Sequence, residues 1–136
     1  MIDQELKETI NQKIQGGEFE VTDIPGYFTL FAQIGNETED GQDEIEDWNR
    51  RINFVMAGLG TYWISVENGR FSTGKGTLED PNLVLTLDAA QAALIFAGKK
   101  DAVAAFMSGA LTVQGDLPDA LKLQTLIEIV AEEIEY

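Results

Sequence analysis

The side chains that most enzymes use for covalent or metal chemistry are scarce in this sequence. It contains no histidine and no cysteine among its 136 residues. This excludes a Ser-His-Asp or Cys-His arrangement and the zinc sites that depend on those ligands. Carboxylates remain, but they cluster where water can solvate them rather than in apolar segments that would suit acid-base catalysis. We therefore expect a protein that is not an enzyme and has no cofactor and no metal.

One glycine-rich segment has part of the spacing of a phosphate-binding loop. Gly69, four further residues and then Gly74-Lys75 match the pattern, but Gly76 stands where a serine or threonine would contact Mg²⁺. A phosphate-binding loop also joins a strand to the N-terminus of a helix, whereas this segment lies within a predicted hairpin strand. We interpret these glycines as part of a twisted edge strand.

The most acidic segment has some of the spacing of a calcium loop. It holds seven acids in the eleven residues from Glu37 to Asp47. A calcium loop has an acid at its first position, an apolar residue at the eighth and a bidentate glutamate at the twelfth, and here these are Asn36, Asp43 and Asp47. We favour a solvated acidic loop or helix, with weak attraction of divalent cations as the alternative.

The charge of the whole chain restricts its partners. Nine basic residues against 24 acidic ones give a net charge of −15, which repels nucleic acid and anionic lipid headgroups. The pair Lys99-Lys100 could attract an acidic headgroup, but we favour an interaction with the end of a helix and with solvent. No apolar run is long enough for a transmembrane segment, and the first residues do not have the pattern of a secretory signal. We expect a cytoplasmic protein.

The first third of the chain is predicted to be helical. A helix over 3–15 has Asp3 as its cap and an apolar stripe of Leu6, Ile10 and Ile14. A second helix follows Asp23, with Pro25 near its first position.

The middle of the chain alternates as strands do. Asn68-Gly69 is a two-residue hairpin signal between two of them. The predicted strands cover 51–59, 61–67, 70–77, 83–87 and 110–114.

The remaining helices fall in the C-terminal half. They are predicted from Asp88 to Gly98, from Asp101 to Ser108, and from about Leu117 onward, with Gly98, Gly109 and Gly115 at chain reversals that need positive φ. The last helix is apolar over more than one stripe. It is therefore either packed between the sheet and another chain, or packed on the sheet with its other side lining an apolar cavity.

A series of motifs in this half resembles the sterol carrier protein type-2 lipid-transfer domain. Ala105-Phe106 is followed by Gly109, by the alternating pair Leu111 and Val113, by Gly115-Asp116, and by Ala120-x-Lys122-Leu123. The similarity extends from about Arg51 to about Ile127.

This resemblance implies an α+β fold with a curved sheet of about five strands, helices covering one face, and an apolar tunnel between them. It also implies non-catalytic binding and transfer of a fatty acid, fatty acyl-CoA or sterol-like molecule. By the same resemblance, the tunnel wall is expected to contain Phe96, Phe106, Met107, Leu117, Leu121, Leu126 and Trp63.

We expect one domain over residues 1–136, with residues 1–50 as a helical N-terminal extension. The alternative is a protein-interaction module of the same fold, with a filled cavity and a last helix that forms a homodimer.

Overall fold

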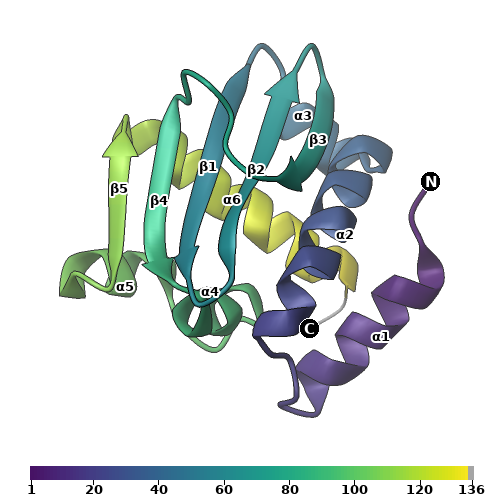
Figure 1. Ribbon diagram of the computed structural model, residues 1–136. Helices are drawn as coiled ribbons and strands as arrows, with labels where there is room; N and C mark the ends of the chain where they lie inside the picture. The colour runs from purple at the N-terminus through teal and green to yellow at the C-terminus, as the bar shows by residue number, and fades with distance from the viewer. Residues whose placement is uncertain (135–136) are drawn as a thin grey trace.

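The computed structural model describes residues 1–134, which form one open sheet with helices packed against one of its faces (Figure 1). The five strands have the order β3-β2-β1-β4-β5. β4 runs parallel to β1, and all other neighbours are antiparallel. The strands are β1 (Arg50–Ala57), β2 (Gly60–Glu67), β3 (Arg70–Lys75), β4 (Leu83–Asp88) and β5 (Leu111–Gly115).

The helices lie before, between and after the strands. The helices before the sheet are α1 (Gln4–Gln15), the short 3-10 helix η1 (Val21–Asp23), α2 (Ile24–Glu37) and α3 (Glu39–Glu44). The later ones are α4 (Ala89–Phe96), α5 (Ala102–Ser108) and the long α6 (Leu117–Ile134). Among the described residues, none of these helices combines the length and apolarity needed to cross a membrane.

Alternation along the strands decides which face of the sheet is covered. Ile52, Phe54 and Met56 of β1 and Ile64 of β2 are at most 2% exposed and point toward the helices. The turn between β2 and β3 has φ of 53° at Asn68 and 78° at its following glycine, as a type I′ turn requires. The α+β fold class and the five strands are thus confirmed, with the first strand ending at Ala57.

The parallel pairing of β4 with β1 requires the chain to cross the open face of the sheet after β3. Asn53 holds this crossing: its side-chain amide donates to the carbonyl of Leu78 at 3.1 Å and accepts from the Leu78 N–H at 3.0 Å. It is only 2% exposed, so the two hydrogen bonds satisfy a buried polar group.

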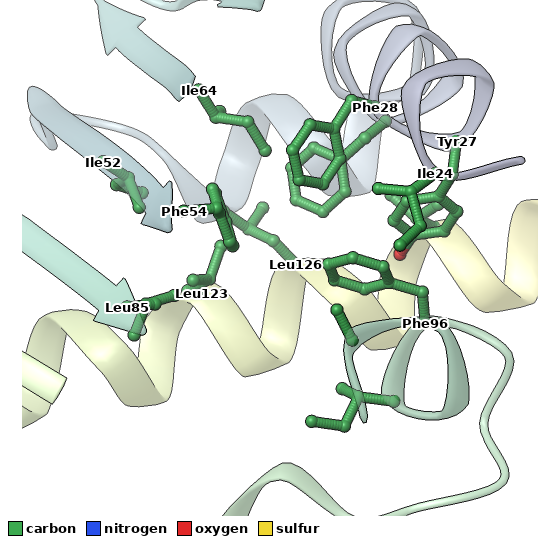
Figure 2. Close-up of a cluster of buried hydrophobic side chains, with 14 of the residues drawn as sticks. Ile24, Tyr27, Phe28, Ile52, Phe54, Ile64, Leu85, Phe96, Leu123 and Leu126 are labelled. Atoms are coloured by element: carbon green, nitrogen blue, oxygen red, sulfur yellow. The ribbon is translucent and has the colours of Figure 1, made fainter. Parts of the chain in front are cut away.

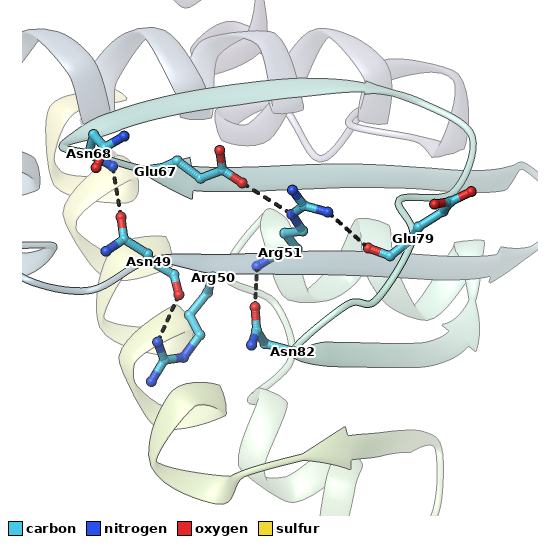
Figure 3. A network of polar contacts seen from close by, with 7 residues as sticks. All are labelled: Asn49, Arg50, Arg51, Glu67, Asn68, Glu79 and Asn82. Carbon is cyan, nitrogen blue, oxygen red and sulfur yellow. Dashed lines mark hydrogen bonds and ion pairs between the residues drawn. The ribbon is translucent and has the colours of Figure 1, made fainter.

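A polar network at the start of β1 fixes the end of the same crossing (Figure 3). The Arg51 guanidinium contacts the Glu67 carboxylate at 3.1 Å and donates to the carbonyl of Glu79 at 3.1 Å. The Arg51 backbone N–H donates to the Asn82 side chain at 2.8 Å, and Asn49 accepts from the backbone N–H of Asn68. These contacts tie β4 to the register of β1.

The main core lies between the sheet, α2 and α6, and it is rich in aromatic rings (Figure 2). Tyr27 and Phe96 stack with centroids 4.6 Å apart, and Phe28 packs on Phe54 at 4.9 Å. The residues Ile10 and Ile14 of α1 join the same core. The N-terminal helices are therefore packed into the body of the fold.

Candidate functional site

A cavity of about 350 Å³ lies at the β4–β5 end of the sheet, enclosed by α4, α5 and α6. Among the described residues that line it, Gln124 is the only polar one. Its inner wall is formed by buried side chains of the sheet and of α4, which are Phe54, Leu85, Leu87, Ala92, Ile95 and Phe96. The cavity is therefore an apolar extension of the core.

The outer wall of the cavity comes from helical faces with regular spacing. Val103, Phe106 and Met107 project from one side of α5, and Leu117 and Leu121 project from the first turns of α6. These side chains are between 39% and 80% exposed, in contrast to the inner wall. The cavity therefore opens to the surface between α5 and the start of α6.

Local sequence features hold α5 and β5 in place around the cavity. The Asp101 carboxylate accepts from the Val103 N–H at 3.1 Å and caps α5. Gly109 ends the helix with φ of 86°, and the chain turns into β5. Leu111 and Val113 then point into the cavity because they alternate with residues on the opposite face of the strand.

Five of the seven predicted wall residues line this cavity, which are Phe96, Phe106, Met107, Leu117 and Leu121. Contact of these residues with a lipid stays a prediction.

The other two predicted wall residues, Trp63 and Leu126, lie outside the cavity. Trp63 is on the face of β2 opposite the helices, against Gly74, where a Cβ would come within 2.6 Å of the indole. Leu126 is 2% exposed and projects from α6 into the main core (Figure 2). Neither side chain therefore forms part of the cavity wall.

A smaller hollow of about 170 Å³ adjoins the main cavity and shares Ile95, Ala102, Gln124 and Ile127 with it. Lys100 lines this hollow, but so do Asp101 and Glu128. The negative charges of Asp101 and Glu128 therefore oppose the binding of a ligand carboxylate next to Lys100.

A buried carboxylate fixes the first turn of α6, which carries part of the cavity mouth. Asp119 accepts from the Trp48 indole N–H at 2.9 Å and from Arg50 Nε at 2.8 Å, and it is 7% exposed. Burial by itself would raise the pKa of Asp119, but the hydrogen bonds from Arg50 and Trp48 and the charges of Arg50 and Lys122 lower it below its ordinary value. The carboxylate is thus held ionised as a structural anchor.

Sequence reasoning did not identify Asp119. Among the described residues it is the one buried acid, and so it departs from the expectation that the acids are solvated. The two partners of this residue lie 71 and 69 positions away in the sequence. By contrast, Leu111 and Val113 could have been predicted as cavity-lining residues, because their alternation in a short strand already placed them on one face.

The two motifs with partial matches have structural roles. Gly74 makes room for an indole within β3, and Asn36 pairs with the backbone of Phe71 at 2.7 and 3.0 Å. In the part of the chain that the structure describes, no group of three or more acidic side chains could hold a metal ion.

The fold recurs in proteins of known structure. Sterol carrier protein 2 from Yarrowia lipolytica has a TM-score of 0.58 and 23% identity, over 70% of this chain and 88% of that one. Palmitated SCP2L2 from Aedes aegypti has a TM-score of 0.52 and 18% identity, over 71% of this chain and 85% of that one.

A curated relative is much longer than this chain. Hydroxysteroid dehydrogenase-like protein 2 from Xenopus laevis is 34% identical over 77 residues, which are 54% of this chain and 18% of the relative. The chain thus spans about a fifth of the length of that protein.

A family model described as the SCP-2 sterol transfer family matches residues 29–128. The match begins before Arg51, where the similarity in the motifs starts, and so includes most of α2. It confirms the resemblance carried by the motifs between Ala105 and Leu123, and the chain belongs to the SCP-2 sterol transfer family.

Proposed function

We propose that this protein binds a lipid with a long hydrocarbon part in the cavity between β4, β5 and helices α4 to α6, and transfers it without chemical change. The observation that carries the proposal is the cavity itself, which is lined almost entirely by apolar side chains and opens at the surface. A solid interior, as in the alternative of a filled interaction module, would leave no such volume.

The size and polarity of the cavity suit a hydrocarbon chain. Its volume of about 350 Å³ is near the lower end of the roughly 300–1,000 Å³ typical of ligand sites. Ten buried CH₂ groups would contribute about 8 kcal/mol before ordering costs, the order of free energy of a micromolar complex. Affinity should therefore depend mainly on chain length, with fatty acids and fatty acyl groups as the first candidates.

One protein of similar fold supports the same ligand class. The Aedes aegypti structure is of a palmitated protein, which makes a fatty acyl group a candidate ligand for this chain. The wall residues Phe96, Phe106, Met107, Leu117 and Leu121 would then contact the chain of the ligand.

The composition of the site supports binding without catalysis. Gln124 is the only described lining residue that can donate or accept a strong hydrogen bond, and its amide does not titrate. The buried carboxylate of Asp119 is already paired with Trp48 and Arg50 and is not part of the lining. The cavity therefore offers neither a nucleophile nor an acid-base pair.

Titration of the purified protein with a fluorescent long-chain fatty acid tests the proposal. Phe106→Asp places a charge in the wall and should lower affinity by at least an order of magnitude, because burying a carboxylate against hydrocarbon is strongly unfavourable. Leu94→Asp is the matched control, since Leu94 is 42% exposed and Phe106 43%, but Leu94 does not line the cavity. Equal affinities of the two variants would contradict the assignment of the site, and no binding by the unaltered protein would contradict the function.

A further inference from the structure

The exposed hydrophobic side chains of this protein are concentrated at the mouth of the cavity. We call five of them the apolar rim, namely Val103, Phe106, Met107, Leu117 and Leu121. The described residues expose only three other large hydrophobic side chains, and these do not line the cavity, namely Met1, Val55 and Leu94. Surface patches of this kind on a small protein are often interaction sites.

The apolar rim has a defined geometry. On α5, Val103, Phe106 and Met107 have i, i+3, i+4 spacing, and on α6, Leu117 and Leu121 are one turn apart. Both faces line the same cavity, so the rim is continuous with its interior. In Figure 1, α5 lies at the left edge of the molecule and α1 at the right edge, so the N-terminal helices do not cover α5.

The α5 part of the apolar rim lies in an uncharged stretch of the chain. The α6 part does not, because Asp116, Asp119 and Lys122 flank Leu117 and Leu121, although Asp119 and Lys122 are paired with Arg50 and Glu44. No charged residue occurs over 102–115, although the chain carries 24 acids. Asp101 and Asp116 border this stretch, and Asp101 is used as a helix cap. Lys99 and Lys100 lie just before it, and neither forms an ion pair with any described residue.

We propose that the apolar rim docks the cavity mouth onto a lipid bilayer whose surface is electrically neutral, such as one of phosphatidylcholine. This inference rests on the proposed function and names the partner of the same site. The uncharged α5 part of the rim can enter the headgroup region of a zwitterionic surface without desolvating a charge, and Lys99-Lys100 can meet its phosphate groups.

The net charge distinguishes this partner from two others. A charge of −15 repels an anionic bilayer, and it also opposes the pairing of two copies of the chain through their rims. A zwitterionic bilayer offers hydrocarbon beneath headgroups of zero net charge, so it adds no such repulsion.

Docking in this orientation would let a lipid enter the cavity without crossing water. The rim residues are also wall residues, so a hydrocarbon chain would pass from the bilayer onto Phe106 and Leu121 directly. Transfer between vesicles should then accelerate with vesicle concentration, because each event requires contact between protein and membrane.

Flotation of the protein with phosphatidylcholine vesicles tests the docking surface. Leu117→Ser should lower the partition coefficient roughly tenfold, because a largely exposed leucine loses most of its gain on burial. Met107→Ser should act in the same way. Leu94→Ser is the matched control, with the same change at a residue of similar exposure outside the rim, and it should change partitioning less than twofold. Phosphatidylserine vesicles should bind the unaltered protein more weakly at low salt.

The outcomes separate this inference from the proposed function. Protein that binds the fluorescent fatty acid but does not float with vesicles would overturn the docking surface and leave the function standing. Protein that floats with vesicles but binds no fatty acid would overturn the proposed function and leave the docking surface standing. Equal losses for Leu117→Ser and Leu94→Ser would also overturn it, as would a dimer in sedimentation velocity that is broken by the rim variants while vesicles remain unbound.

Discussion

Filling the cavity should stabilise the protein and weaken lipid binding at the same time. Two adjacent alanines of α4 allow a controlled comparison, since both are buried but only Ala92 lines the cavity. We expect Ala92→Leu to place its added carbons in the void and Ala93→Leu to place them in a packed core.

The two substitutions are expected to change the free energy of unfolding in opposite directions. The three carbons added at Ala92 would contribute up to about 2.4 kcal/mol at about 0.8 kcal/mol each. Fixing the leucine rotamer would cost about 0.5–1 kcal/mol, so a net stabilisation of about 1–2 kcal/mol is expected. Overpacking by Ala93→Leu should destabilise the fold by about 1–3 kcal/mol instead.

Urea unfolding followed by circular dichroism measures both effects, and equal slopes would show that the unfolded states are comparable. The fluorescent fatty acid should bind Ala92→Leu roughly 50-fold more weakly, because a tenfold change corresponds to about 1.4 kcal/mol and about 2.4 kcal/mol of apolar contact is displaced. Destabilisation of Ala92→Leu equal to that of Ala93→Leu, with unchanged lipid affinity, would refute the presence of usable volume at this wall.

Two further predictions concern buried polar groups. Asp119→Ala should destabilise the fold by about 1–3 kcal/mol at pH 7, because the Trp48 indole N–H and Arg50 Nε lose their acceptor. Since folding lowers the pKa of Asp119, its stabilising contribution is complete above the ordinary value of about 3.9 and is lost as the pH falls below that. The difference in urea midpoint between the variant and the unaltered protein should therefore stay constant from about pH 6 down to the ordinary pKa of about 3.9 and shrink as the pH falls further toward about pH 3. A difference that stays constant over the whole range would contradict this account. Asn53→Ala should cost about 1–3 kcal/mol and speed amide exchange at Leu78, because both backbone groups of Leu78 lose their partner; unchanged exchange would show that the crossing is held by other contacts.

The local structure was predictable where a few neighbouring residues decide it. Asn68-Gly69 adopts the positive φ values of the predicted hairpin turn. Asp3 accepts from the Leu6 N–H at 3.0 Å, as expected of the predicted cap, and Gly109 reverses the chain between α5 and β5. In each case the backbone conformation depends on residue types within one turn.

Features that depend on distant partners were not predictable. The sequence does not show that β4 lies beside β1, because alternation reveals which residues share a face but not which strands are neighbours. Asp88 immediately precedes α4, close to the predicted start of this helix, yet its side chain makes no capping hydrogen bond.

The wall of the cavity was predictable in part for a related reason. The last helix is apolar around much of its circumference, so periodicity could not separate Leu121, at the cavity mouth, from Leu126, in the main core. In the same way, Trp63 and Ile64 lie on opposite faces of one strand, and only the packing of the helices shows which face is inside.

The parallel pairing of β4 with β1 also bears on the order of folding. β1, β2 and β3 are joined by short turns and can pair by closing small loops, whereas β4 reaches β1 only after both hairpins have been traversed. Because longer loops lose more entropy on closure, the three-stranded meander should form first and β4 should add later. The cavity beside β4 and β5 is then the last part of the interior to form. Until it forms, the apolar side chains that line it are exposed in the folding intermediate, where they can cause aggregation.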